Sequence, residues 1–318
     1  MKHSDKPSII FPDLLTKPAT VAFDEPATTS DGGALLLRAL DAGLGFVDRL
    51  ASKVLDGRQA SKVIHQQIDL FRQRVYGIAC GYADCNDADR VSDDPMQKAL
   101  LERDPLGDES LASQATLSRF ENGVRIVELY KMGMELMEFV IERHLKRLGP
   151  RKVKLITIDM DPTEDKTHGA QQLSMFNGHY GAHCYLPQLA FLTFNEEPEQ
   201  YLFAAVLRSG LASAHDGALG ILKRVLPRLR ESFPKARIVV RLDGGFATPK
   251  LFEFLEKQKR VKYLVAFASN PVVLREIEPI MEYVRAMSEL SGETERLFGE
   301  TQYAAKSWKQ ERRLIMKA

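Results

Sequence analysis

The sequence predicts an α+β protein, with a helical first half and a second half built on a mixed β-sheet. Up to about residue 150, apolar side chains recur at three- and four-residue steps, the period of an amphipathic helix. After Arg151, short runs of β-branched and aromatic residues replace this pattern. Helical stretches separate the later runs but not the earlier ones. The expected order is therefore β-β-β-α-β-α-β rather than a repeated βαβ unit.

The composition is that of a folded globular protein without global basicity. Of the 318 residues, 44% are hydrophobic and 27% are charged, and 44 Lys and Arg against 43 Asp and Glu leave a net charge of +1. The first half is slightly acidic and the second slightly basic, which a solvated surface explains as well as a binding face does. Three cysteines are too few for a disulfide framework. With no long apolar run and no visible secretory signal, we expect a soluble, cytoplasmic protein without a membrane partner.

The first 150 residues are predicted to form a helical domain. Residues 1–28 read as extended and are punctuated by prolines, and a first helix follows Gly33. A second helix begins at Ser61, and 83–112 is acidic and turn-rich, with short helical pieces at most. The side chains expected to face inward are, in the first helix, Leu36, Leu40, Leu44, Val47, Leu50 and Val54, and in the second, Ile64, Ile68, Phe71, Val75, Ile78 and Tyr82.

A long helix completes this domain. Thr116 is placed to cap a short helix, and the periodic pattern then runs from about Val124 to Leu148, where Gly149-Pro150 ends it. The residues expected to face inward along the long helix are Val127, Tyr130, Met134, Met137 and Ile141.

Five strand-like runs follow in the second half. They are KVKLITIDMD, CYLPQLAFLTF, QYLFAAVLRSG, ARIVVRLDGGF and VKYLVAFAS. Ser213 and Asp216 have the spacing of a capping box for the helix between the third and fourth runs, and Pro227 is expected to kink or shorten that helix. Thr248-Pro249 opens another helix.

Residues 271–318 have a different pattern. The stretch 271–290 reads as a helix that is kinked near Pro279. The residues after it alternate like two edge strands of a hairpin.

Two apolar strands end in carboxylates. Leu155–Ile158 runs into Asp159 and Asp161, and Ile238–Val240 runs towards Asp243, which two glycines follow. Because a strand has a period of two, Asp159 and Asp161 point to the same side and can share a cation. Carboxylates at the ends of neighbouring strands suit Mg²⁺ (or Mn²⁺), and such ions support phosphodiester chemistry. For Asp159 or Asp161 alone, a simple turn residue is the alternative interpretation.

One resemblance of this segment is to haloacid-dehalogenase-type phosphatases. Their first motif is matched by Asp159-Met160-Asp161-Pro162-Thr163. The resemblance implies that Asp159 is a nucleophile and Asp161 a general acid/base. The paired acidic motif of that family has no good counterpart, because the run at 241–245 offers one carboxylate.

A broader resemblance is to DDE transposases of bacterial insertion sequences, within the IS-thirteen-eighty group of the IS-four-like set. It rests on seven blocks in order, at 30–46, 82–95, 111–122, 158–172, 176–191, 207–218 and 241–249. It implies a ribonuclease-H-like catalytic core over 151–270, behind a helical domain over 1–150 that binds DNA ends. It also implies metal-dependent strand cleavage and transfer at the ends of the element. The first catalytic Asp matches Asp161 best, with Asp159 as the alternative, and the second matches Asp243.

The third carboxylate of the resemblance has no match. The family's catalytic Glu lies on a helix beyond a β-rich insertion that interrupts the core, and 271–318 resembles the start of that insertion. Glu300 and Glu311 match nothing in the last motif. We therefore expect a catalytic core that is incomplete at the C-terminus and inactive alone, with a non-catalytic DNA-binding remnant as the alternative.

Candidate DNA contacts lie in both halves. Arg208 follows a predicted strand, and Lys223 and Arg224 belong to a basic cluster on a helix, although a surface role explains all three as well. Gln114 and Arg119 belong to the TLSRF region of the helical domain, for which the resemblance implies DNA-end binding. His179, Tyr180 and His183 are expected to line the groove or to pack their loop. The resemblance also implies a homodimer that holds two DNA ends.

Overall fold

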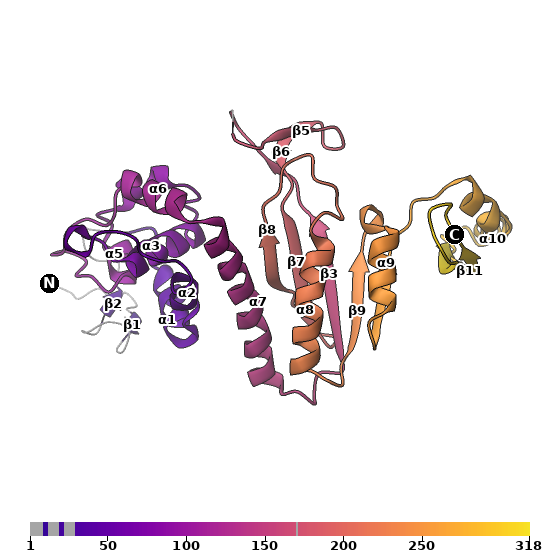
Figure 1. Ribbon diagram of the computed structural model, residues 1–318, viewed down its shortest axis with the longest axis horizontal. Helices are drawn as coiled ribbons and strands as arrows, with labels where there is room; N and C mark the ends of the chain where they lie inside the picture. Colours follow the sequence, from indigo (N-terminus) through magenta and orange to yellow (C-terminus); the bar gives the residue numbers. More distant parts are fainter. Residues whose placement is uncertain (1–8, 12–18, 22–28, 170) are drawn as a thin grey trace. The chain divides into compact units, whose positions relative to one another are not determined.

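The computed structural model describes residues 9–11, 19–21, 29–169 and 171–318 (Figure 1). The chain divides into two compact units, the first ending at Phe139 and the second beginning at Val140. In this part of the chain no helix is both long and apolar enough to cross a membrane.

The first unit is helical, apart from one short hairpin. Strands β1 and β2 pair antiparallel within the stretch expected to be extended, the rest of which lies outside the described residues. Helices α4 and α5 are the short pieces expected in the acidic stretch. The elements are β1 (Ile9–Phe11), β2 (Ala19–Val21), α1 (Ala34–Leu44), α2 (Phe46–Ala51), α3 (Gln67–Ala79), α4 (Ala88–Val91), α5 (Pro95–Leu100), α6 (Gln114–Gly123) and the first part of α7 (Ile126–Leu148), with 3-10 turns at Ala60–Lys62 and Cys85–Asp87.

The predicted inward stripe of the first helix is wrong in its first part and right in its second, where Val47 is buried and Leu50 and Val54 pack against the same core. Leu36 is 65% exposed and Leu40 57% exposed, whereas Leu35, Arg38 and Asp41 are buried. The helix ends at Leu44, because Gly45 adopts the left-handed conformation with φ 65° and the chain restarts as α2. The predicted residues after this break, Val47, Leu50 and Val54, face the core, whereas Leu36 and Leu40 before it do not. The polar residues that α1 buries instead, Arg38 and Asp41, have partners distant in sequence.

Tyr76 and Asp41 show how that polar face is buried. The Tyr76 hydroxyl donates to Asp41 Oδ2 at 2.8 Å, and the Val47 amide donates to Asp41 Oδ1 at 3.0 Å. Burial and the hydrogen bond to Asp41 raise the pKa of Tyr76. Arg38 pairs with Glu102. The apolar core around these groups includes Leu35, Val47, Phe71, Leu100 and Leu111.

The other predicted helices are present, and their predicted inward residues are right in part. In the second helix Ile64 and Ile78 are exposed, while Phe71 is buried as expected. Thr116 does not cap α6, because the helix begins at Gln114 after Ser113. In α7 the expected Val127 and Tyr130 are exposed, because that turn instead buries Glu128, which accepts from the Leu55 and Arg125 amides. Further along, Met137 and Ile141 are buried as predicted.

The second unit contains a five-stranded mixed sheet. Its strands are β3 (Leu155–Pro162), β7 (Gln188–Phe194), β8 (Tyr201–Val206), β9 (Arg237–Leu242) and β10 (Val261–Val265), in the order β10-β9-β3-β7-β8. β3, β7 and β8 form an antiparallel meander, and β9 and β10 run parallel to β3. Helices α8 (Ala218–Ser232) and α9 (Pro249–Glu256) precede and follow β9 (Figure 1). The predicted β-β-β-α-β-α-β order is confirmed for this sheet.

Aromatic stacking attaches the end of α7 to this sheet. The His144 ring lies parallel to that of Phe194 with centroids 4.3 Å apart, and it also contacts Tyr201 at 4.1 Å. Its Nδ1 lies 2.7 Å from the Val140 carbonyl. Burial lowers the pKa of His144, so the neutral ring is favoured.

Of the two helices beside β9, the start of α9 was predicted correctly and that of α8 was not. The expected capping box is wrong: α8 begins at Ala218 after Gly217 (φ 80°), and the Ser213 amide donates to Asp216 Oδ2 in a turn before the helix. Pro227 lies within α8 without ending it. Helix α9 follows Thr248 and begins with Pro249, as predicted.

A small second sheet was not predicted. Strands β4 (Asp165–Lys166), β6 (Ala182–Tyr185) and β5 (Met175–Asn177) pair in the order β4-β6-β5. The run expected as one strand is split between this sheet and β7, because Pro187 has no amide hydrogen to continue a ladder.

The C-terminal part confirms the predicted helix and hairpin. α10 (Pro271–Ser291) is capped by Asn270, whose side chain accepts from two amides, and β11 (Phe298–Tyr303) pairs antiparallel with β12 (Arg312–Lys317). Trp308 lies 5.2 Å from Phe252 of α9 and 5.6 Å from Tyr303, measured between ring centroids. Arg312 donates to Glu256 Oε1 at 2.7 Å. These contacts attach the hairpin to α9.

Candidate catalytic carboxylates

Asp161 and Asp243 lie at the same end of two neighbouring parallel strands. In the register of β3 and β9, Asp159 is opposite Arg241 and Met160 is opposite Leu242. Asp161 is the next residue of β3, and Asp243 follows directly after the last residue of β9. The buried Met160 and Leu242 point to the other side of the sheet. The fold thus brings together two residues that are far apart in sequence, as predicted.

The two carboxylates repel each other. Partial burial and the charge of Asp243 raise the pKa of Asp161. No cation of the described residues pairs with Asp161 or Asp243. Asp243 Oδ1 accepts from the Gly245 amide at 2.9 Å, which fixes its rotamer at the start of a 3-10 turn. A cation between the two groups would relieve this repulsion.

Asp159 has a different set of partners. Its Oδ1 accepts from Arg241 Nε and its Oδ2 from Arg241 Nη2, both at 2.7 Å. Gln200 Nε2 donates to the same Oδ2 at 3.3 Å. Asp159 and Asp161 share a face of the sheet, as the strand period predicts, but both oxygens of Asp159 are already engaged.

Glu164 and Tyr180 complete the electrostatic surroundings. Burial, followed by the charges of Asp161, Glu164 and Asp243, raises the pKa of the half-buried Tyr180. Glu164 Oε1 is buried without a hydrogen-bond partner. Sequence reasoning missed Glu164, and the signal that could have found it is its place three residues after Asp161 in an acidic run. The ring of His179 contacts Tyr180, whereas that of His183 contacts Phe176.

The donor set fits a hard divalent cation with few protein ligands. Among the described residues there is no group of three or more His, Cys, Asp or Glu that could hold one ion. Mg²⁺ is commonly bound through one or two carboxylates and keeps several waters. Asp161 and Asp243 meet that requirement, and their unrelieved repulsion favours such an ion.

Arg208 is held by backbone carbonyls. Its Nε donates to the Leu186 carbonyl at 2.8 Å, and its Nη1 donates to those of Ser213 (2.9 Å) and Asp216 (2.8 Å). Its Nη2 is buried without a partner. The guanidinium thereby ties the segment after β8 to the β6–β7 connection, and these contacts explain Arg208 without a phosphate.

Lys223 and Arg224 lie on the exposed face of α8. The opposite face buries Leu222, Val225 and Leu226. The helix is therefore amphipathic, and the solvent-facing cations are placed where either a solvated surface or a DNA backbone would require them.

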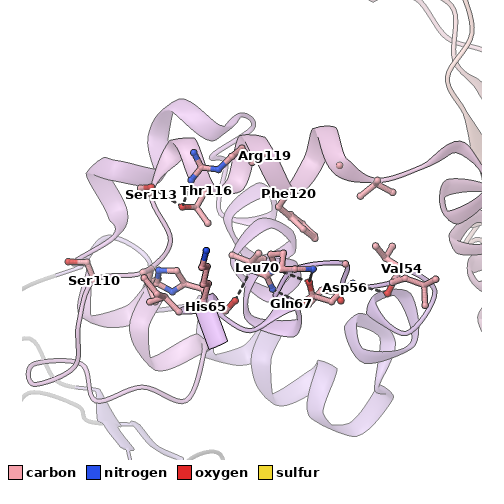
Figure 2. Close-up of a pocket in the computed structure, with 18 of the residues that line it drawn as sticks. Val54, Asp56, His65, Gln67, Leu70, Ser110, Ser113, Thr116, Arg119 and Phe120 are labelled. Atoms are coloured by element: carbon pink, nitrogen blue, oxygen red, sulfur yellow. Dashed lines mark hydrogen bonds and ion pairs between the residues drawn. The ribbon is translucent and has the colours of Figure 1, made fainter. Parts of the chain in front are cut away.

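Arg119 borders a cavity in the helical unit, whereas Gln114 does not. The cavity has a volume of about 850 Å³, and Figure 2 shows Arg119 and Thr116 of α6 above His65 and Leu70. Arg119 Nη2 donates to Thr116 Oγ1 at 3.3 Å. The Gln114 amide donates to Asp89 Oδ1 at 2.7 Å, outside the lining.

Comparison with known families assigns the chain to a transposase family. The chain matches the family described as "Transposase DDE domain group 1" over residues 11–318, and it belongs to that family. Comparison with curated proteins found no significant match. Membership implies action on DNA in transposition, and such proteins generally use divalent metal ions.

Proposed function

We propose that the protein carries a metal-dependent centre for strand cleavage and strand transfer at insertion-sequence ends, with Asp161 and Asp243 as its carboxylates. The observation behind this proposal is the pair of mutually repelling carboxylates at the ends of two adjacent parallel strands. Mg²⁺ or Mn²⁺ is the proposed ion. Membership of a DDE transposase family supplies the reaction class.

The strand arrangement supports a ribonuclease-H-like core. An antiparallel meander (β3, β7, β8) is followed by two strands parallel to β3, with a helix before each of them. The resemblance to the IS-thirteen-eighty group implies this arrangement. In the proposed division, 1–150 is the DNA-end-binding domain, 151–270 the core and 271–318 belongs to the insertion.

The residues of the chain have distinct proposed tasks. Asp161 and Asp243 hold the cation, which when bound activates the attacking oxygen and stabilises the leaving one in phosphodiester chemistry. The Gly245 amide holds Asp243 in one orientation through its hydrogen bond to Oδ1. Tyr180, whose raised pKa keeps its phenol protonated, can donate a hydrogen bond to a phosphate oxygen beside the two carboxylates.

Asp161 is preferred to Asp159 as the first carboxylate. Both oxygens of Asp159 accept hydrogen bonds from Arg241, so a nucleophilic or metal-binding role would first require this pair to break. The same contacts weigh against the haloacid-dehalogenase-like phosphatase, which needs Asp159 as the nucleophile.

DNA contacts are proposed on both units. Arg119 at the cavity and the solvent-facing Lys223 and Arg224 are the candidates, with Gln114 as a further candidate on α6. Arg208 is proposed to act indirectly, by holding the segment after β8. A homodimer would present two such sets to two DNA ends.

We further propose that the chain is inactive alone. Within the described residues no third carboxylate joins the pair at coordinating distance. Two carboxylates can hold one hydrated metal ion, whereas phosphodiester transfer commonly uses two metal ions.

A supercoiled plasmid carrying the element's end tests these proposals. We expect the purified chain to bind Mn²⁺ and the plasmid without nicking it. Nicking that depends on Mn²⁺ and disappears in Asp161→Asn and Asp243→Asn would contradict the inactivity while supporting the centre. DNA binding with no Mn²⁺ binding would favour the non-catalytic remnant. Hydrolysis of a simple phosphate ester that Asp159→Asn abolishes would favour the phosphatase.

A further inference from the structure

We infer that Arg241 is a positioning residue that withholds Asp159 from the cation and so decides which carboxylates form the metal site. This role rests on the proposed function, because it concerns the cation that Asp161 and Asp243 would hold. It makes the Asp159–Arg241 pair a neutral neighbour of the site rather than a part of it.

The geometry of the pair is that of a two-pronged Arg–carboxylate interaction. Nε and Nη2 of Arg241 each lie 2.7 Å from a different oxygen of Asp159. The two residues are directly opposite each other in the parallel register of β3 and β9. The guanidinium and the carboxylate therefore make two parallel hydrogen bonds in one plane. A lysine, with a single ammonium group, could not reproduce this arrangement.

The pair lies next to the candidate site on the same face of the sheet. Asp159 precedes Asp161 by two residues on β3, and Arg241 precedes Asp243 by two residues on the β9 side. A two-residue step along a strand is about 7 Å and returns to the same face. Without Arg241, three carboxylates would face the cation from this surface, and the positive charge paired with Asp159 would be gone.

The charge balance explains what Arg241 contributes. Paired with Asp159, it leaves the net charge beside the site near zero, so the cation is drawn to Asp161 and Asp243. If Arg241 is removed, a positive charge disappears and a free carboxylate appears about 7 Å from Asp161. Both changes favour a divalent ion, and Coulomb's law at this range gives an affinity gain on the order of tenfold.

Asp159→Asn has the opposite effect. The positive charge of Arg241, which is 50% exposed, then lacks its counter-charge and repels the cation. We expect Mn²⁺ to bind several-fold more weakly to this variant. In the double variant Arg241→Met/Asp159→Asn both charges are absent, so the affinity returns close to that of the wild type.

A double-mutant cycle read by Mn²⁺ affinity tests the inference. Free Mn²⁺ is followed by electron paramagnetic resonance in titrations of the full chain, the two single variants and the double variant. Arg241→Lys retains the charge and should stay within about threefold of the wild type, which separates an electrostatic role from a purely structural one. Far-ultraviolet circular dichroism reports whether each variant is folded.

Arg313→Met is the matched control. Arg313 also makes a two-pronged pair with a carboxylate, that of Glu300, across a β-ladder of the same unit but away from Asp161. Its loss should leave Mn²⁺ affinity unchanged.

The outcomes separate the inference from the proposed function. Tighter binding by Arg241→Met, reversed in the double variant, supports the inference. Unchanged or weaker binding by a folded Arg241→Met, with Asp161→Asn still abolishing binding, overturns the inference alone. Binding that Asp161→Asn does not reduce, or no binding to the wild type, overturns the proposed function and the inference with it.

Discussion

Replacing Asp161 by Asn should stabilise the metal-free protein. The substitution removes one of two like charges at the ends of strands that lie about 4.8 Å apart, while it keeps the shape of the side chain. In water-like surroundings, two unit charges about 5 Å apart repel by about 1 kcal/mol. For a unit of this size that free energy corresponds to a rise in melting temperature of roughly 2–4 °C.

Differential scanning calorimetry in EDTA and in Mg²⁺ measures the effect. In EDTA, Asp161→Asn should melt above the wild type, whereas in Mg²⁺ the order should reverse, because the ion stabilises the protein that binds it. Asp159→Asn is the matched control and should show no gain, since it breaks the pair with Arg241. A lower melting temperature for Asp161→Asn in EDTA would refute the reasoning, because it would mean that the Asp161 carboxylate is stabilised by a partner rather than repelled.

Three further predictions concern the fold. Burial lowers the pKa of His144 in the folded state, so its stabilising contribution is complete above the unfolded pKa of about 6.5 and is lost as the pH falls below that value. In urea titrations between pH 8 and pH 5, His144→Phe should therefore lose less stability on acidification than the wild type. An identical pH profile for the two proteins would contradict this. Tyr76→Phe leaves a buried Asp41 oxygen without its donor and should lower the free energy of unfolding, measured by urea denaturation, by about 1–3 kcal/mol. An unchanged free energy of unfolding would contradict this. Trp308→Ala removes a half-buried ring from between Phe252 and Tyr303 and should cost about 2 kcal/mol, with faster proteolysis of the hairpin; a hairpin as resistant as that of the wild type would contradict this.

The central sheet was predictable because its signal is local. Strands such as β3 and β9 carry continuous β-branched runs, and their carboxylates follow directly on the chain. The order of helices and strands was readable for the same reason. Parallel strands in one sheet bring their carboxyl ends to one edge, which is why Asp161 and Asp243 could be paired before their geometry was known.

The prediction for the first helix was wrong because its buried face includes the polar residues Arg38 and Asp41 beside Ala34 and Leu35. Arg38 and Asp41 are buried only because Glu102 and Tyr76, distant in sequence, neutralise or bond to them. Periodicity counts apolar residues and therefore selected the exposed Leu36 and Leu40 instead. The small β4-β6-β5 sheet was missed because strands of two to four residues are too short to give a periodic signal.

The partner of Asp159 was also beyond sequence reasoning. Strand period places Asp159 and Asp161 on one face, and that much is right. The residue opposite Asp159 depends on the register between β3 and β9, which are joined through five more strands and a helix rather than a short turn. Arg241 therefore became visible as a neighbour only in the folded sheet.

The proposal that Asp161 and Asp243 hold the cation is tested most directly by affinity cleavage. Fe²⁺ bound in place of Mg²⁺ and treated with ascorbate and peroxide generates hydroxyl radicals that cut the backbone beside the ion, and the fragments are identified by mass spectrometry. We expect cuts next to Asp161 and Asp243, suppressed by excess Mg²⁺ and lost in Asp161→Asn. Cuts confined to other segments, or cuts at these positions that persist in Asp161→Asn, would contradict the proposed site.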